Sequence, residues 1–205
     1  MKKITLIFGT LMLMTGGCSW LYGTGTDDTD LSDSELYVND FFFTNQDEET
    51  VTNEDLAGDY WVANMVFTRC PTVCNMMTPN MASLQVDLQE QGLEIPIVSF
   101  TVDPDFDDPE QLRSYGENYN ADFDSWHFLT GYEQEDIEAL AQQSFATVVE
   151  EDPEANDIIH STQHYLIDPD GQIIRQYDGM ETDTVPIAAD IEAAQSDDSQ
   201  NLWPF

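Results

Sequence analysis

The amino-acid sequence predicts an α/β fold in which helices flank a central mixed β-sheet. Between residues 60 and 144, apolar runs typical of buried strands alternate with amphipathic helical patterns. Two further strand patterns then follow each other directly, joined by the turn Asp168-Pro169-Asp170-Gly171. The chain has 205 residues, which is enough for one well-packed domain and too few for two ordinary ones. We therefore expect a single α/β sandwich.

The predicted domain opens with a β-hairpin. Residues 41–44 and 49–51 have strand character and flank a polar turn at residues 45–48. Residues 53–58 predict one helical turn that is ended by a glycine. The nearly continuous apolar run at residues 60–67 then predicts a strand that is covered on both faces.

A helix is expected after this strand, because apolar side chains fall on one helical stripe that runs to a stop at Gly92. Its start is open: Thr78 could cap a helix whose first residue is Pro79, or the helix could begin at Cys74 and kink. The stripe includes methionines, which we interpret as core residues rather than metal ligands. Met77 and Met81 lie on the stripe, and the neighbouring Met76 is interpreted in the same way.

The rest of the domain continues the alternation of strands and helices. In chain order we expect a strand at residues 95–102, a helix at 109–119, a strand at 126–131 and a helix at 133–144. A short strand at 145–149, an acidic loop at 150–157, a strand pair at 163–167 and 172–177, and a closing helix at 184–194 follow. The domain is expected to span residues 37–195, after a flexible acidic tether at 18–36 and before a loose polar tail at 196–205. The sequence has no internal repeat and no glycine-rich phosphate loop, which argues against a nucleotide-dependent enzyme.

Residues 1–17 are typical of the signal peptide of an exported lipoprotein. Two lysines precede the apolar run 4–14, which is shorter than the ~20 residues needed to cross a bilayer. Small residues then precede Cys18 in a pattern that resembles a bacterial lipobox, although Thr15 stands where an aliphatic residue is usual. We expect lipid on Cys18 to anchor the protein in the cell membrane, with the domain on the extracytoplasmic side. The alternative is an ordinary signal peptide in which Cys18 is incidental.

Acidic residues dominate the chain, with 41 Asp and Glu against 5 Lys and Arg and a formal net charge of −36. Loss of the leader would leave three arginines against 41 acidic residues, a formal charge of −38. Such a charge excludes nucleic acid as a natural partner, because phosphate contacts need Lys and Arg. Salt relieves self-repulsion of this size, so we interpret the chain as halophilic or salt-tolerant. The competing interpretation is an acidic surface that gathers cations, copper included.

Cys70 and Cys74 carry the most distinctive chemistry of the sequence. They are four residues apart where a strand gives way to a helix, and helix N-termini stabilise thiolates. Soft thiolates also bind Cu(I), zinc and iron–sulfur centres. If Cys18 carries lipid, these are the only two cysteines left, and a loop this short gains little from a structural disulfide. The pair is therefore either a redox dithiol or part of a soft-metal site.

A metal site built on two cysteines needs a third ligand, and three histidines are available. Tetrahedral zinc would need four Cys or His ligands and there is no second cysteine pair, whereas copper accepts two thiolates and one imidazole. His127 lies in an apolar strand beside Trp126 and is interpreted as structural. The spacing of the sequence does not choose between His160 and His164.

Several blocks of the sequence together resemble the Sco (SenC) family over about residues 37–194. These blocks are Phe67-Thr68-x-Cys70-Pro71-x-x-Cys74, Ser99-Phe100-Thr101-Val102-Asp103-Pro104 with Asp107, Trp126-His127-Phe128-Leu129-Thr130-Gly131, Ile159-His160-Ser161-Thr162 and Tyr165-Leu166-Ile167-Asp168. The resemblance implies a thioredoxin-like fold, a membrane-tethered domain outside the cytoplasm and a role in building the binuclear copper centre of cytochrome c oxidase. It also implies that Cys70, Cys74 and His160 bind copper, as Cu(I) or Cu(II).

The resemblance extends to residues near these ligands. Asp103 matches the aspartate of the family's Asp-Pro turn and is expected beside the site; turn or helix-cap chemistry is the alternative for Asp103 and Asp107. Arg69 is the positive charge beside the thiols, and it could lower their pKa, dock a partner or simply be solvated. His164 occupies a position where the family does not require histidine, so we expect it at the surface or beside the site.

Two functions are consistent with these residues. The first is a copper metallochaperone, a binding protein that passes the ion to the copper-bearing subunit of cytochrome c oxidase. The second is a membrane-tethered thiol–disulfide oxidoreductase that reduces the copper-ligand cysteines of the oxidase, for which no histidine is needed. Other copper chaperones or thioredoxin-like reductants are further expected partners. A peroxidase is disfavoured, because peroxidatic sites prefer a lone activated cysteine.

Overall fold

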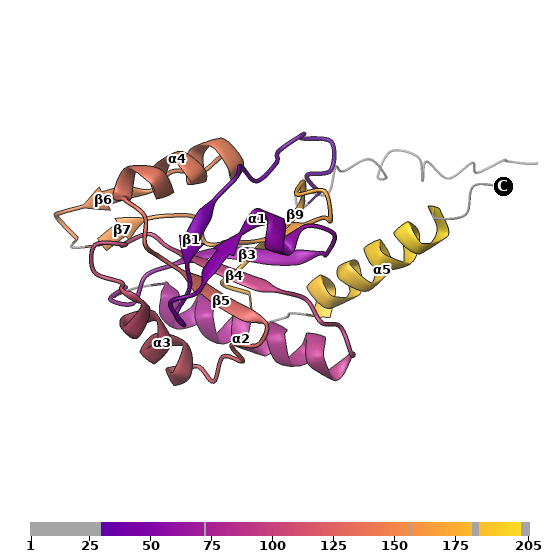
Figure 1. Cartoon of the computed structure of the whole chain (residues 1–205), viewed down its shortest axis with the longest axis horizontal. Helices are drawn as coiled ribbons and strands as arrows, with labels where there is room; N and C mark the ends of the chain where they lie inside the picture. The colour runs from indigo at the N-terminus through magenta and orange to yellow at the C-terminus, as the bar shows by residue number, and fades with distance from the viewer. Residues whose placement is uncertain (1–29, 72, 156, 182–184, 202–205) are drawn as a thin grey trace, which may run out of the picture.

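The structure is a computed structural model that describes residues 30–71, 73–155, 157–181 and 185–201 (Figure 1). The leader, Cys18 and most of the expected tether lie outside these residues. Within the described ranges, no helix combines the length and the apolar character that a membrane crossing requires.

A five-stranded mixed sheet forms the centre of the domain, with the order β5-β4-β3-β8-β9. Its strands are β3 (Trp61–Val66), β4 (Ile97–Thr101), β5 (Trp126–Leu129), β8 (Gln163–Ile167) and β9 (Ile173–Asp178). The first three pair in parallel, β8 runs antiparallel to β3, and β9 runs antiparallel to β8. The mixed sheet predicted from the order of the elements is therefore confirmed. All residues of β3 are buried, as expected for a central strand with both faces covered.

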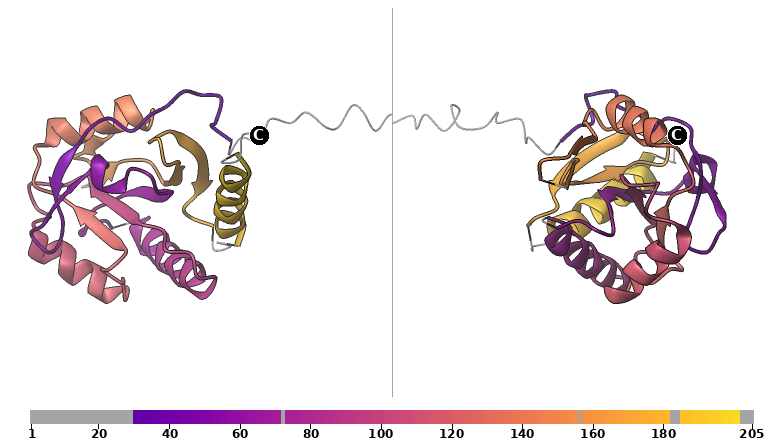
Figure 2. Two further views of the ribbon diagram at one scale, coloured as in Figure 1. Left: turned by 45° about the vertical axis from the view of Figure 1, so that its right-hand side comes forward. Right: turned by 90° about the vertical axis from the view of Figure 1, so that its left-hand side faces the viewer.

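Helices and a hairpin cover the two faces of this sheet. One face packs against α2 (Cys74–Glu90), α3 (Pro109–Asn118) and α5 (Val185–Asn201). The other packs against α4 (Gln134–Ser144), α1 (Asn53–Leu56) and the predicted hairpin of β1 (Phe42–Thr44) and β2 (Thr50–Thr52). In both views of Figure 2, α4 lies on one side of the sheet and α2 with α3 on the other. A small second hairpin pairs β6 (Glu150–Asp152) with β7 (Asp157–Ile159).

The helix after β3 begins at Cys74 and contains Pro79, which decides between the two predicted starts. Met77 and Met81 are fully buried, so their assignment to the core is confirmed. Met76 is 49% exposed, and its assignment to the core is wrong. It lies one position before Met77 on the helix, so it points away from the buried stripe.

Two segments differ from the sequence-based expectation between residues 145 and 159. The predicted strand at 145–149 is absent, because the chain turns there with Ala146 in the left-handed region (φ 51°). The predicted acidic loop at 150–157 instead forms most of the β6–β7 hairpin, in which Glu150 pairs with Ile159. The sequence does not indicate this hairpin, because its exposed side chains are acidic and strand prediction depends on apolar side chains. The hairpin itself is formed by hydrogen bonds between backbone groups.

The ends of the domain are also more ordered than expected. In the region predicted as tether, the Leu31 N–H donates to the Ile174 carbonyl at 2.8 Å, and Leu31 and Leu36 pack against the core. The apolar side chains of these two leucines hold this otherwise polar segment against the domain beside β9. The closing helix passes its expected end at Ala194 and continues to Asn201, so the described part of the predicted tail, residues 196–201, is helical. Neither Gly nor Pro occurs between Ala194 and Asn201.

Candidate metal centre

The fold brings Cys70, Cys74 and His160 to one edge of the sheet. The cysteines lie on the segment that joins the end of β3 to the start of α2. His160 lies between β7 and β8, far away in sequence. Because β8 runs antiparallel to β3, β8 begins at the edge where β3 ends, and the residue that enters it comes close to the cysteines.

One ligand atom from each of these three residues lies within 4.8 Å of the other two. Cys74 Sγ lies 3.9 Å from His160 Nε2. His160 Nδ1 lies 2.8 Å from the Ser161 carbonyl oxygen, which can only accept, so Nδ1 donates and Nε2 keeps its lone pair for the site. The Phe67 ring and the imidazole pack edge to face, with ring centroids 5.7 Å apart. The histidine is thus oriented before any ligand binds.

The two thiols have different environments. Cys74 is 2% exposed whereas Cys70 is only partly buried, and neither forms a disulfide bond. The Cys74 N–H, at the start of α2, points at Cys70 Sγ over 3.4 Å and favours a thiolate there. The hydrogen bond to Cys70 and burial together raise the pKa of the Cys74 thiol far above its usual range. Metal binding at Cys74 must therefore release a tightly held proton.

Arg69 and Asp103 form a bidentate ion pair beside Cys70. Arg69 Nε lies 2.5 Å from Asp103 Oδ2, and Nη2 lies 3.1 Å from Oδ1. The guanidinium also stacks on the ring of Phe106, 4.8 Å from its centroid. Both oxygens of Asp103 are thus occupied by an arginine, so this aspartate holds Arg69 in place rather than binding a metal. The charge of Arg69 is compensated, although half of its side chain is exposed.

Asp107 contacts the cysteine segment directly, which the turn or cap role considered for it does not explain. Its carboxylate is fully buried and accepts hydrogen bonds from the backbone and the side chain of Thr68. Asp108, not Asp107, caps α3. Desolvation by burial raises the pKa of Asp107, against the hydrogen bonds from Thr101 and Thr68. In the sequence, an aspartate two residues before a helical proline looks like an ordinary capping residue, which is why this role was missed.

The other two histidines do not join the group. His164 is 2% exposed on β8, and burial lowers its pKa to about 4, so it is neutral at physiological pH. The expectation of a surface position for His164 is therefore wrong: its place on the second residue of β8 points it into the core. His127 lies on β5, partly buried. Within the described ranges, the Cys70, Cys74 and His160 group is the only one with three clustered metal ligands.

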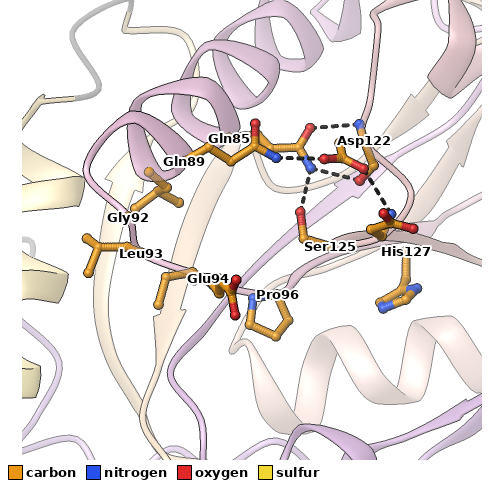
Figure 3. A pocket seen from close by; sticks show the side chains of 12 residues that line it. Gln85, Gln89, Gly92, Leu93, Glu94, Pro96, Asp122, Ser125 and His127 are labelled. Atoms are coloured by element: carbon orange, nitrogen blue, oxygen red, sulfur yellow. Dashed lines mark hydrogen bonds between the residues drawn. The ribbon is translucent and has the colours of Figure 1, made fainter.

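A pocket with a volume of about 510 Å³ lies at the opposite end of α2 (Figure 3). Its lining combines apolar side chains with polar ones that hydrogen-bond to one another. Gln85 Nε2 donates to Ser125 Oγ at 2.9 Å, and Gln89 Nε2 donates to Asp122 Oδ2 at 2.8 Å. His127 contributes to its wall, and no cysteine does. The pocket is therefore separate from the metal-ligand group.

Two thiolates and one imidazole are a soft donor set that suits copper, whereas structural zinc would take a fourth Cys or His ligand. His160 and Cys70 are both partly exposed, so an ion held by the group would be reachable from outside. The same dithiol can close to a disulfide and open again. The arrangement therefore supports either ion transfer or thiol–disulfide exchange.

Comparison with known proteins gives consistent results. The family model described as SCO1/SenC matches residues 29–196. The SCO1 protein homolog of Bacillus subtilis is 37% identical over 185 residues, which cover 89% of this chain and 96% of that protein. The crystal structure of a SCO1/SenC family lipoprotein from Bacillus anthracis has a TM-score of 0.74 at 40% identity, covering 78% of this chain and 95% of that one.

Two further structures are informative. BsSco, a member of the Sco family of cytochrome c oxidase assembly proteins with an identified disulfide switch, has a TM-score of 0.72 at 39% identity, over 78% of this chain and 94% of that one. Arabidopsis thaliana ScoI, solved with copper bound, has a TM-score of 0.65 at 21% identity, over 78% and 99% of the two chains, a likeness that concerns the fold alone. Together, these structures confirm the predicted thioredoxin-like sandwich.

Proposed function

Because the chain belongs to the SCO1/SenC family, we propose that it binds copper through Cys70, Cys74 and His160 and delivers it to the copper-bearing subunit of cytochrome c oxidase. The observation that carries this proposal is the approach of three soft ligand atoms to within 4.8 Å of one another. The description of BsSco as a member of a family of oxidase assembly proteins supports the choice of client. The donor set of two thiolates and one imidazole supports the choice of metal.

The unequal burial of the ligands suits an ion that must be passed on. A client ligand approaching from solvent would meet His160 and Cys70 before the buried Cys74. The raised pKa of Cys74 means that its sulfur takes up a proton readily once copper leaves. We expect release to proceed by stepwise exchange of ligands, ending with protonation of Cys74.

A copper titration of the reduced protein without its leader, in molar salt, tests the proposal. We expect one tightly bound equivalent, which is lost in Cys70→Ser, Cys74→Ser and His160→Ala. His127→Gln is the matched control, because His127 lies on β5 outside the group and should not affect binding. Full affinity in either cysteine variant would refute the ligand set.

A specific observation also favours the oxidoreductase. Cys70 Sγ lies at the start of α2, where the Cys74 N–H stabilises a thiolate, and Cys74 is placed beside it as a second thiol. In this reaction the Cys70 thiolate attacks a client disulfide and displaces one client thiolate. Cys74, losing its proton, then attacks the mixed disulfide and frees the second client thiol, so two electrons pass from the dithiol to the client. A His160→Ala variant that reduces an oxidised client peptide without binding copper would favour this role.

For the location, we propose that lipid on Cys18 anchors the domain at the extracytoplasmic face of the cell membrane, where it meets the oxidase and thioredoxin-like reductants or other copper chaperones. The lipoprotein from Bacillus anthracis supports this proposal. Cys18→Ser should move the protein from the membrane fraction to the soluble fraction and abolish incorporation of labelled palmitate. A membrane-bound, unlabelled Cys18→Ser protein would contradict lipid anchoring.

A further inference from the structure

We infer that Asp107 is a positioning residue that sets the place of the Cys70 thiol, acting through Thr68. The inference rests on the proposed role of Cys70 as a copper ligand or redox thiol. Asp107 touches neither the cysteines nor His160 in any recorded hydrogen bond. It acts instead on Thr68, two residues before Cys70.

The carboxylate of Asp107 accepts three hydrogen bonds in the interior of the protein. Oδ2 accepts from the Thr68 N–H at 3.0 Å and from Thr101 Oγ1 at 2.5 Å. Oδ1 accepts from Thr68 Oγ1 at 2.5 Å. Burying a carboxylate costs much free energy unless hydrogen bonds compensate for the lost hydration. The fully buried Asp107 therefore depends on these three donors.

Thr68 lies just beyond the end of the sheet. Strand β3 ends at Val66, which pairs with Thr101, the last residue of β4. The Thr68 N–H therefore donates to the Asp107 carboxylate where a strand carbonyl is no longer available. The direction in which the chain leaves the sheet toward Cys70 is thus set by a side chain and not by the ladder.

Asp107 is itself held from two directions. Its N–H donates to the Asp103 carbonyl at 2.9 Å, and its own carbonyl accepts from Thr130 Oγ1 at 2.7 Å, at the end of β5. Asp103 in turn holds Arg69, the residue after Thr68. Two aspartates of the loop after β4 therefore hold two consecutive residues, Thr68 and Arg69, immediately before Cys70.

The hydrogen bonds between Asp107 and Thr68 should affect copper binding and disulfide formation, because both depend on how closely Cys70 is held to Cys74 and His160. Removal of a hydrogen bond that orients metal ligands typically costs about 10- to 100-fold in metal affinity. A looser Cys70 also lowers the effective concentration of one thiol at the other. Both quantities should respond to Thr68, although it binds nothing itself.

The test compares Thr68→Val with Thr130→Val in the protein without its leader. Both substitutions remove one hydroxyl that donates to Asp107. Thr68 lies on the cysteine segment and donates to the carboxylate, whereas Thr130 donates only to the backbone carbonyl of Asp107, whose N–H remains bonded to Asp103. The Cu(I) affinity is measured by competition with a chromogenic chelator. The Cys70–Cys74 disulfide equilibrium is measured in a dithiothreitol redox buffer, and urea unfolding records the stability of each variant.

We expect Thr68→Val to weaken Cu(I) binding about tenfold and to lower the disulfide equilibrium constant several-fold. Thr68→Ser, which keeps the hydroxyl, should behave like the parent protein. Thr130→Val should lose stability and leave both site properties within twofold of the parent. Unchanged site properties in Thr68→Val, or equal changes in Thr130→Val, would overturn the inference. If the parent protein binds no copper, the metallochaperone proposal fails and the disulfide equilibrium alone decides the role of Asp107.

Discussion

Replacing His164 with leucine should remove a loss of stability that the protein suffers on acidification. His164 is 2% exposed, and within the described part of the chain neither ring nitrogen has a hydrogen-bond partner. Burial lowers its pKa to about 4 from the ordinary value of 6.5, against a weaker opposing effect of Asp178. The folded protein therefore resists protonation of a residue that titrates freely in the unfolded chain.

The sign of the effect follows from this lowered pKa. Above pH 6.5 the imidazole is neutral in both states, and protonation does not affect the equilibrium. As the pH falls from 6.5 to about 4, the unfolded chain takes up a proton that the folded chain does not, so the folded state loses stability. The difference of about 2.5 pKa units corresponds to roughly 3 kcal/mol. Such a loss is large against the 5–15 kcal/mol that typically separates folded and unfolded states.

Urea unfolding of the parent and of His164→Leu, in molar salt at several pH values from 7.5 to 4, measures this effect. Carboxylates titrate over part of the same range, so the quantity to follow is the difference between the two proteins. At pH 7.5 we expect the leucine variant to be at least as stable, because an unpartnered polar group has been replaced by an apolar one. The difference should then grow by roughly 3 kcal/mol toward pH 4. A difference that is independent of pH, or a strong loss of stability at pH 7.5, would refute the reasoning.

Three further predictions concern the thiols, the N-terminal segment and the charge. Iodoacetamide at pH 7 should modify Cys70 well before Cys74, because Cys74 is buried and its pKa is raised; mass spectrometry of partly labelled protein gives the order, and equal labelling would contradict it. Leu36→Ala should lower the free energy of unfolding by about 1–2 kcal/mol, because Leu36 packs on the core, whereas the exposed Asp33→Ala control should not. Raising NaCl from 0.1 to 2 M should raise the melting temperature, because salt screens a formal charge of −36. A melting temperature that does not respond to salt would argue against the halophilic interpretation.

Much of the fold could be predicted from local sequence patterns. The strand at Trp61–Val66 was predicted because a continuous apolar run needs cover on both faces, and the structure buries every residue of it. The turn before β9 was predicted because Asp-Pro-Asp-Gly favours one, and Gly171 indeed adopts a positive φ of 84°. Features of this kind depend only on residues close in sequence, so they can be predicted from the sequence.

The predictions that failed depended on contacts between distant segments. Nothing near Glu150 indicates that it will pair with Ile159, because the ladder uses backbone groups and leaves the acidic side chains in solvent. Leu31 lies in a polar stretch and is seated only because β9 offers it a partner. His164 is one residue within a strand pattern, and its burial depends on which face α2 and α5 cover.

The sequence by itself determined the α/β class, the order of the main elements and the soft character of the site, because periodicity, turn residues and paired cysteines are local signals. It left His160 and His164 equally eligible as the third ligand on spacing alone, and only the resemblance to a known family separated them. The tertiary structure places His160 beside Cys74 and turns His164 into the core, because β8 runs antiparallel to β3 and its side chains alternate between faces. Asp107 gained its role in the same way, since a carboxylate 39 residues from Thr68 becomes its partner only when β3 and β4 end side by side.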